Sequence, residues 1–211
     1  MAVTFALGCP GGECDKLDDA LSIVALDAFG ERVVGDLASL TGLRLPGPDP
    51  MIEIRVGIEP RPAAVSSVWY QILAGSSCPD GADAICLVGD GVWLPHALAA
   101  VVQLTTLPGI ICIDFADLRT AFHGRGPVRG TSVAGPSLAD AGVRCVDEAV
   151  ELLRGATWAL VHVQAGPPAT LADVVQIVEA VERVAFNREI EVLFNFYAAT
   201  DGAARVTLLC V

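Results

Sequence analysis

The sequence predicts an α/β fold: a reduced parallel-sheet layer joined by a central helix to an α+β two-layer sandwich. Strand-like and helix-like segments alternate through the first half, which is typical of parallel sheets. An uncharged apolar run with helix-like residues 94–107 divides the chain, and two periodic helices accompany strands in the second half. We therefore expect an N-terminal domain over 1–92, the central helix over 93–108 and a second domain over 109–211.

The first half opens with strand 3–7 and a glycine turn, GCPGGEC. The apolar spacing of 17–41 then predicts a helix, with Asp18 or Asp19 near its N-terminus, where acidic side chains suit the helix dipole. Three further elements are expected: strand 52–58, helix 64–76 and buried strand 82–90.

The second half reads as a run of strands and helices after the central helix. The expected elements are strand and loop PGIICIDF, helix DLRTAFHG, strand GPVRGTSVAG, helix 139–153, strand 157–165, helix 170–185, and strands 189–198 and 205–211. Asp201-Gly202 is a good hairpin turn, so we expect the last two strands to form a hairpin.

Composition excludes several classes of function. The 211 residues are 53% apolar, enough for a sizeable core, and the formal net charge is −12. No Lys/Arg cluster is present, so we expect no nucleic-acid partner. Lys16 is the one lysine and GxxxxGK[ST] is absent, which excludes a P-loop.

The cysteines and histidines indicate a reduced, cytoplasmic protein without a metal site. The seven cysteines are odd in number and irregularly spaced, unlike a secreted disulfide framework. Cys9 and Cys14 flank the glycine turn without a CxxC pair, and His96, His123 and His162 are scattered. The uncharged stretch 91–113 is interrupted by proline and glycine, so a buried helix and strand are favoured over a membrane span.

One stretch carries a family resemblance: LPGIICIDFADLRTAFHGRGPVRGTSVAG, residues 107–135. It resembles the tubulin-like GTPases, specifically bacterial FtsZ and its relatives, in which a helix ending in Pro-Gly runs into a loop N-x-D-F-A-D. IRVGIEPRP, ADAICLVGDGVWL, RGATWALVHVQAGPPATLADVVQIVEAV and RVTLLCV resemble other segments of the family, so the likeness covers most of 52–211. It implies a reduced nucleotide-type domain followed by an FtsZ C-terminal-like sandwich.

The resemblance assigns roles to the DFADL loop. In the family this loop enters the next subunit's nucleotide pocket, and its carboxylates polarise the attacking water. Asp114 and Asp117 hold those catalytic places here, while Cys112 replaces the family's asparagine and cannot both donate and accept as an amide does. With Cys112, the resemblance implies interface positions at Phe115, Arg119 and His123. The alternative is that Asp114 and Asp117 only cap the following helix.

The glycine turn is the one candidate for the family's phosphate loop, with Gly8, Gly11 and Gly12 as nucleotide-binding residues. Pro10 removes a donor, and the acids around the turn repel a triphosphate. We therefore expect no cofactor and no GTP hydrolysis. The chain is then expected to be a bacterial pseudo-GTPase of the cell-division cytoskeleton and not an enzyme. It would bind itself or an FtsZ-like filament protein, without direct membrane binding. The alternatives are a GTPase using GTP and Mg²⁺ in a pocket rebuilt around GCPGGEC, or a small enzyme dependent on Cys9 or Cys14.

Overall fold

The computed structural model describes residues 3–5, 21–41, 52–60, 62, 70–79, 81–106, 113–185, 189–198 and 204–211. The chain divides into two compact units, Met1–Leu107 with Phe122–Val128, and Pro108–Ala121 with Arg129–Val211. The segment expected as a separate central helix belongs to the first unit. The chain then enters the second unit at Pro108, and Phe122–Val128 belong to the first unit again.

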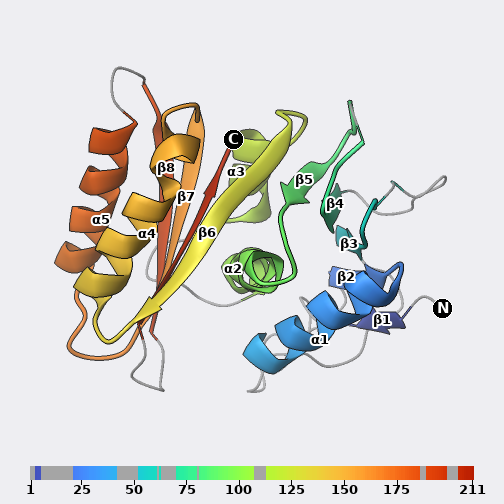
Figure 1. Ribbon diagram of the computed structural model, residues 1–211, viewed down its shortest axis with the longest axis horizontal. Helices are drawn as coiled ribbons and strands as arrows, with labels where there is room; N and C mark the ends of the chain where they lie inside the picture. Colours follow the sequence, from blue (N-terminus) through green and yellow to red (C-terminus); the bar gives the residue numbers. More distant parts are fainter. Residues whose placement is uncertain are drawn as a thin grey trace. The chain divides into compact units, whose positions relative to one another are not determined.

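The first unit is built on a largely parallel sheet (Figure 1). Its elements are β1 (Val3–Phe5), β2 (Leu21–Ala25), α1 (Ala28–Thr41), β3 (Ile52–Val56), β4 (Tyr70–Gly75), β5 (Ile85–Val88) and α2 (Trp93–Thr106). The strands lie in the order β1-β2-β3-β4-β5; β1 is antiparallel to β2, and the other neighbours are parallel. The start of β6, Pro127 and Val128, pairs with β5 in parallel. The predicted parallel α/β unit is therefore confirmed.

A row of isoleucines crosses this sheet. Ile23, Ile54, Ile72 and Ile85 occupy neighbouring register positions on β2, β3, β4 and β5, and each is at most 2% exposed. β-branched side chains pack well against one another on a pleated surface, and a sheet covered on both faces needs such apolar runs. The strands predicted at 52–58 and 82–90, and the helix at 94–107, are confirmed.

The helix predicted over 17–41 is wrong in its first part. Leu21–Ala25 form strand β2, and α1 begins at Ala28, while Asp18 and Asp19 lie outside the described residues. A short apolar run cannot be assigned to helix or strand by periodicity alone, and here two neighbouring strands give LSIVA its hydrogen-bond partners.

The helix predicted over 64–76 is also wrong where the structure describes it. Tyr70–Gly75 form β4, inserted between β3 and β5. Ile72, Leu73 and Ala74 are fully buried in succession, as expected for a parallel strand with both faces covered.

The second unit contains a mixed sheet with two helices on one face (Figure 1). Its elements are α3 (Phe115–Phe122, whose last residue belongs to the first unit), β6 (Pro127–Gly135, from Arg129 onward), α4 (Leu138–Leu153), β7 (Trp158–Ala165), α5 (Leu171–Val184), β8 (Glu191–Ala198) and β9 (Ala204–Cys210). All seven lie close to their predicted positions. One core joins the inner faces of α4 and α5 to the sheet, with Cys145, Val174 and Val206 among its buried members. The predicted α+β layer is confirmed.

The predicted hairpin between the last two strands is wrong. The strand order is β6-β9-β7-β8, so β9 lies between β6 and β7, antiparallel to both, while β8 pairs with β7 in parallel. Six of the seven β9 residues are buried, which suits a central position. Several β8 side chains stay half-buried, as expected at a sheet edge.

A row of polar side chains crosses the same sheet. Ser132, Thr207, His162 and Asn195 occupy neighbouring register positions on β6, β9, β7 and β8. Thr207, His162 and Asn195 are at most 3% exposed, and the hydroxyls of Ser132 and Thr207 are 2.8 Å apart. Burial lowers the pKa of His162 to about 4, so the imidazole is neutral at pH 7.

Among the described residues, no helix combines the length and the apolar character that crossing a membrane requires.

Candidate functional site

The carboxyl edge of the parallel sheet in the first unit is where a doubly wound fold binds its ligand. Three described loops meet there, following β3, β4 and β5. Gly57 N–H donates to the carbonyl of Ala74, and Gly89 N–H donates to the carbonyl of Gly75, at 3.0 and 2.9 Å. These bonds continue the sheet beyond its strands and bring the loops into contact.

Asp27 lies at the N-terminus of α1, at this edge of the sheet. One carboxylate oxygen accepts from Gly30 N–H at 2.8 Å, and the other accepts from Ile58 N–H at 2.8 Å. Burial raises the pKa of the Asp27 carboxyl, but the backbone hydrogen bonds outweigh burial, so its pKa is lowered. A helix N-terminus is a ready site for an anion such as phosphate. In α1, the protein's own carboxylate fills that place.

Asp90 closes the start of α2 in the same way. Its Oδ1 accepts from Val92 N–H at 3.0 Å and from Trp93 N–H at 2.8 Å. The described residues of the loops at this edge carry Asp27, Glu59 and Asp90 and no basic side chain. The two described helices of the first unit, α1 and α2, therefore begin at a carboxylate, and the described part of this edge is acidic.

Two large apolar side chains are exposed on these same loops. Ile58 is 52% exposed and Val92 is 76% exposed. Exposed apolar side chains beside a polar rim suit a protein contact better than a phosphate cradle.

The nucleotide-binding residues predicted at Gly8, Gly11 and Gly12, together with Cys9 and Cys14, lie outside the described residues. The residues that directly follow this turn also lie outside the described residues, and the next described element is strand β2, antiparallel to β1.

Asp114 and Asp117 form a reciprocal cap at the start of α3. Asp117 N–H donates to Oδ1 of Asp114, and Asp114 N–H donates to Oδ2 of Asp117, both at 3.0 Å. This is the arrangement of a capping box, with aspartate in both places. Both side chains are exposed, so one oxygen of each carboxylate caps the helix while the residue stays accessible. The two aspartates therefore cap α3, while a cap-only role and catalysis in trans both stay predictions.

The predicted interface residues that the structure describes belong to two different units. Phe115 and Arg119 belong to α3 in the second unit, half-buried and exposed respectively. His123 belongs to the first unit, where its Nε2 lies 3.3 Å from Oδ1 of Asp83. Cys112 lies outside the described residues.

Replacing Asp114 by alanine is expected to lower the unfolding free energy by about 1 kcal/mol, because α3 loses its N-cap. Asp114→Asn is the matched control: asparagine caps about as well as aspartate, so this variant should stay close to the wild type. Urea unfolding followed by circular dichroism measures both. Equal losses in the two variants would contradict a capping role.

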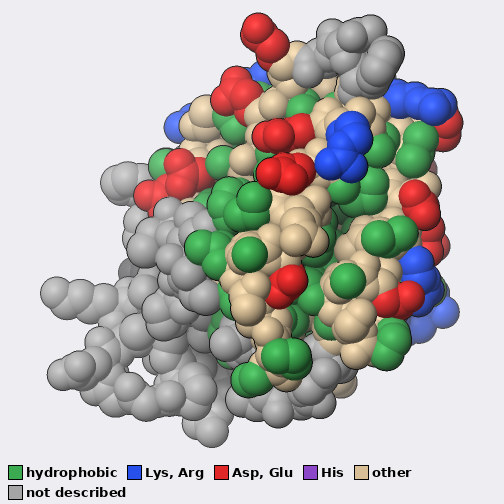
Figure 2. All heavy atoms as spheres, turned by 90° about the vertical axis from the view of Figure 1, so that its left-hand side faces the viewer, with side chains coloured by type: hydrophobic (Ala, Val, Ile, Leu, Met, Phe, Trp, Pro, Cys, Tyr) green, Lys and Arg blue, Asp and Glu red, His purple; other side chains and the backbone are tan. Residues whose placement is uncertain are grey.

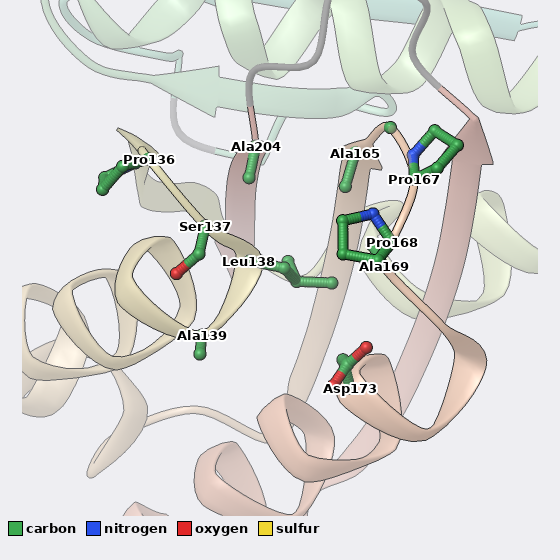
Figure 3. A pocket seen from close by; sticks show the side chains of 11 residues that line it. Pro136, Ser137, Leu138, Ala139, Ala165, Pro167, Pro168, Ala169, Asp173 and Ala204 are labelled. Atoms are coloured by element: carbon green, nitrogen blue, oxygen red, sulfur yellow. The ribbon is translucent and has the colours of Figure 1, made fainter.

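Among its described residues, the second unit has a pair of hollows on the side of α4 and α5, the side seen in Figure 2. One, of about 290 Å³, lies between the starts of the two helices (Figure 3). Its polar side chains, Ser137 and Asp173, already serve as helix caps, accepting from Asp140 N–H and Thr170 N–H. The other, of about 320 Å³, is a groove along α4 and α5 whose lining includes exposed Val143. Neither hollow brings together groups for catalysis.

No metal centre is formed within the described ranges: they contain no group of three or more His, Cys, Asp or Glu side chains that could hold an ion.

The fold is that of the tubulin/FtsZ-like proteins, as the sequence resemblance implied. Among solved structures, the chain is similar to an empty FtsZ dimer of M. jannaschii, with a TM-score of 0.51 and 15% identity over 92% of this chain and 63% of that one. A mutant of the same FtsZ gives a TM-score of 0.52 and 16% identity over 92% of this chain and 65% of that one. GDP-bound CetZ1 from Haloferax volcanii gives a TM-score of 0.44 and 12% identity over 92% of this chain and 64% of that one. The chain thus spans less than two thirds of the length of these proteins.

The comparison with protein-family models finds no match, and no curated protein matches the sequence.

Proposed function

We propose that this chain is an assembly or filament-modulating protein with a tubulin/FtsZ-like fold that does not bind or hydrolyse GTP. It contacts a neighbour through the start of α3, around Asp114, Phe115 and Arg119. The neighbour is a second copy of the chain or an FtsZ-like filament protein. The role in bacterial cell division that the resemblance implied and the cytoplasmic location that the cysteines indicated are both part of this proposal.

The observation that carries the loss of GTP binding is the position of Asp27. Its carboxylate accepts from Gly30 N–H at the start of α1 and from Ile58 N–H after β3. A phosphate placed there would lose these donors and meet a like charge, which costs on the order of a kcal/mol or more per pair at short range. Asp90 adds a second carboxylate at the start of α2.

Exposure supports the contact role. The α3 start carries exposed Asp114, Asp117 and Arg119 beside half-buried Phe115. In the family, this loop meets the nucleotide face of the next subunit. The corresponding edge here has exposed Ile58 and Val92, which supports a contact between proteins in place of a ligand.

Equilibrium binding of fluorescent GTP with Mg²⁺ tests the first half of the proposal. We expect no saturable binding in the micromolar range. CetZ1 from Haloferax volcanii, whose solved structure holds GDP, is the positive control with labelled GDP. Saturable micromolar binding would contradict the proposal and support the alternative pocket around Gly8, Gly11 and Gly12.

Co-sedimentation with a filament-forming FtsZ, together with sedimentation of the chain alone, tests the second half. We expect the chain to self-associate or to change the amount of FtsZ that pellets. Arg119→Glu, at the proposed contact, should weaken this effect, and Arg183→Glu, a charge reversal at an exposed position on α5, should not. The Asp114→Asn and Asp117→Asn double variant keeps capping side chains and isolates the contribution of the two charges. If the wild type neither self-associates nor changes filament sedimentation or GTP turnover, the proposal fails.

A further inference from the structure

A pair of cysteines in the first unit lies outside the candidate site. Cys86 is on β5, and Cys78 follows the end of β4. Between them a turn runs from Pro79 to Ala82, closed by a bond of 3.3 Å from Ala82 N–H to the Pro79 carbonyl. Gly81 has a φ of +67°, which glycine adopts without strain at the third position of such a turn. The turn carries the chain back, so that Cys78 lies against β5.

The two thiols are in direct contact. Cys78 packs against a small buried cluster formed by Leu73, Ala84 and Cys86. The Cys78 thiol donates a hydrogen bond to the Cys86 sulfur, which lowers the pKa of Cys86 and raises that of Cys78. Cys86 is 5% exposed, whereas Cys78 is half-buried and both are reduced. One thiol is thus open to small reagents, and the second lies directly behind it.

We propose that Cys78 and Cys86 form a thiol–disulfide exchange site whose reagent is a low-molecular-weight disulfide such as glutathione disulfide. The Cys78 thiol passes its proton to the Cys86 sulfur, and the Cys78 sulfur attacks one sulfur of glutathione disulfide, so that a glutathione thiolate leaves. The Cys86 sulfur then attacks the Cys78 sulfur of the mixed disulfide and displaces the second glutathione. One disulfide bond forms in the protein, one is broken in the reagent, and the two thiol protons end on two glutathione molecules.

Two other cysteines provide an internal comparison. Cys145 and Cys210 are buried in the core of the second unit, at 1% and 3% exposure. Both side chains are enclosed by the apolar core, so a reagent as large as glutathione disulfide cannot reach either sulfur. They should stay reduced under conditions that oxidise Cys78 and Cys86.

The experiment uses a folded parent protein in which Cys9, Cys14 and Cys112 are replaced by serine so that they take no part. This parent is treated with glutathione disulfide, and its disulfides are mapped by mass spectrometry. We expect a Cys78–Cys86 disulfide, a loss of two hydrogen atoms from the protein, and reversal by dithiothreitol. The oxidised form should melt several degrees higher, because the new bond closes a loop in the unfolded chain.

Two variants separate the steps. Cys86→Ala should accumulate glutathione on Cys78, because the second sulfur is missing, and Cys78→Ala should leave Cys86 unmodified. Cys145→Ala should react like the parent protein. If a variant fails to fold, mapping of the parent protein alone decides. A native parent that stays reduced, or that keeps glutathione on Cys78 without closing the disulfide, would overturn the proposal. Neither outcome affects the proposed function, which does not depend on these thiols.

Discussion

Gly30→Ala is expected to lower the unfolding free energy by roughly 3 kcal/mol, at the upper end of the usual cost of overpacking. A Cβ at this position would lie 2.2 Å from the carbonyl oxygen and 2.9 Å from the carbonyl carbon of Val56. Both are backbone atoms, and that oxygen also accepts from Leu26 N–H at 2.8 Å. Since β3 pairs with a strand on each side, the sheet cannot yield, and α1 must move away from it.

Gly35→Ala in the same helix is the matched control. No atom lies within 4 Å of a Cβ built there. This substitution should raise the unfolding free energy by about 0.5–1 kcal/mol, because alanine loses less backbone freedom on folding. Urea unfolding of both variants measures the difference. Effects of equal sign and size would contradict the close packing of α1 on β3.

The buried imidazole of His162 is expected to make folding stability depend on pH. Its pKa is about 4 in the folded protein, below the ordinary value of 6.5, because burial disfavours the charged form. Between these two values the unfolded chain binds the proton and the folded chain does not. His162 therefore costs no stability above about pH 6.5. As the pH falls toward 4 the folded state loses stability, by about 3 kcal/mol in all.

His162→Gln removes this titration and keeps a polar side chain. Urea unfolding of both proteins from pH 7.5 to 4.5 gives the difference in unfolding free energy. Other groups, including Asp27, contribute equally to both proteins and cancel. The difference should be constant near pH 7 and should shift by about 1.4 kcal/mol per pH unit in favour of the variant below pH 6. A difference that does not change with pH would refute the burial of an uncharged imidazole.

The sequence predicted the second unit better than the first, for a physical reason. Helices 139–153 and 170–185 have one apolar face each, so their periodicity determines their assignment. Strands β2 and β4 are mostly apolar and do not alternate strictly, and such a pattern does not distinguish a buried strand from a buried helix. The order of the strands in the sheet could also not be predicted from local sequence patterns. The Asp201-Gly202 turn predicted a hairpin, yet β9 pairs with β6, about 75 residues earlier in the chain.

The candidate site was predictable in part. Capping by Asp114 and Asp117 follows from their spacing before an apolar run, and the hydrogen bonds show it, although they do not test whether capping is the only role. Asp27 was missed because the helix was expected to start about ten residues earlier. Its signal was the Asp-Ala-Phe-Gly sequence directly after LSIVAL, an N-cap residue following a strand-like run. The contact between Cys78 and Cys86 depends on the pairing of β4 with β5, which no local pattern encodes.

Asp27 also links two segments that are far apart in the chain. Its two oxygens hold Gly30 in the first turn of α1 and Ile58 in the loop after β3, 31 residues further on. Fraying of that turn would release the loop as well, since both amides depend on a single side chain. The two segments therefore open as one cooperative unit, and this corner of the molecule is more rigid than two independently anchored pieces of backbone would be.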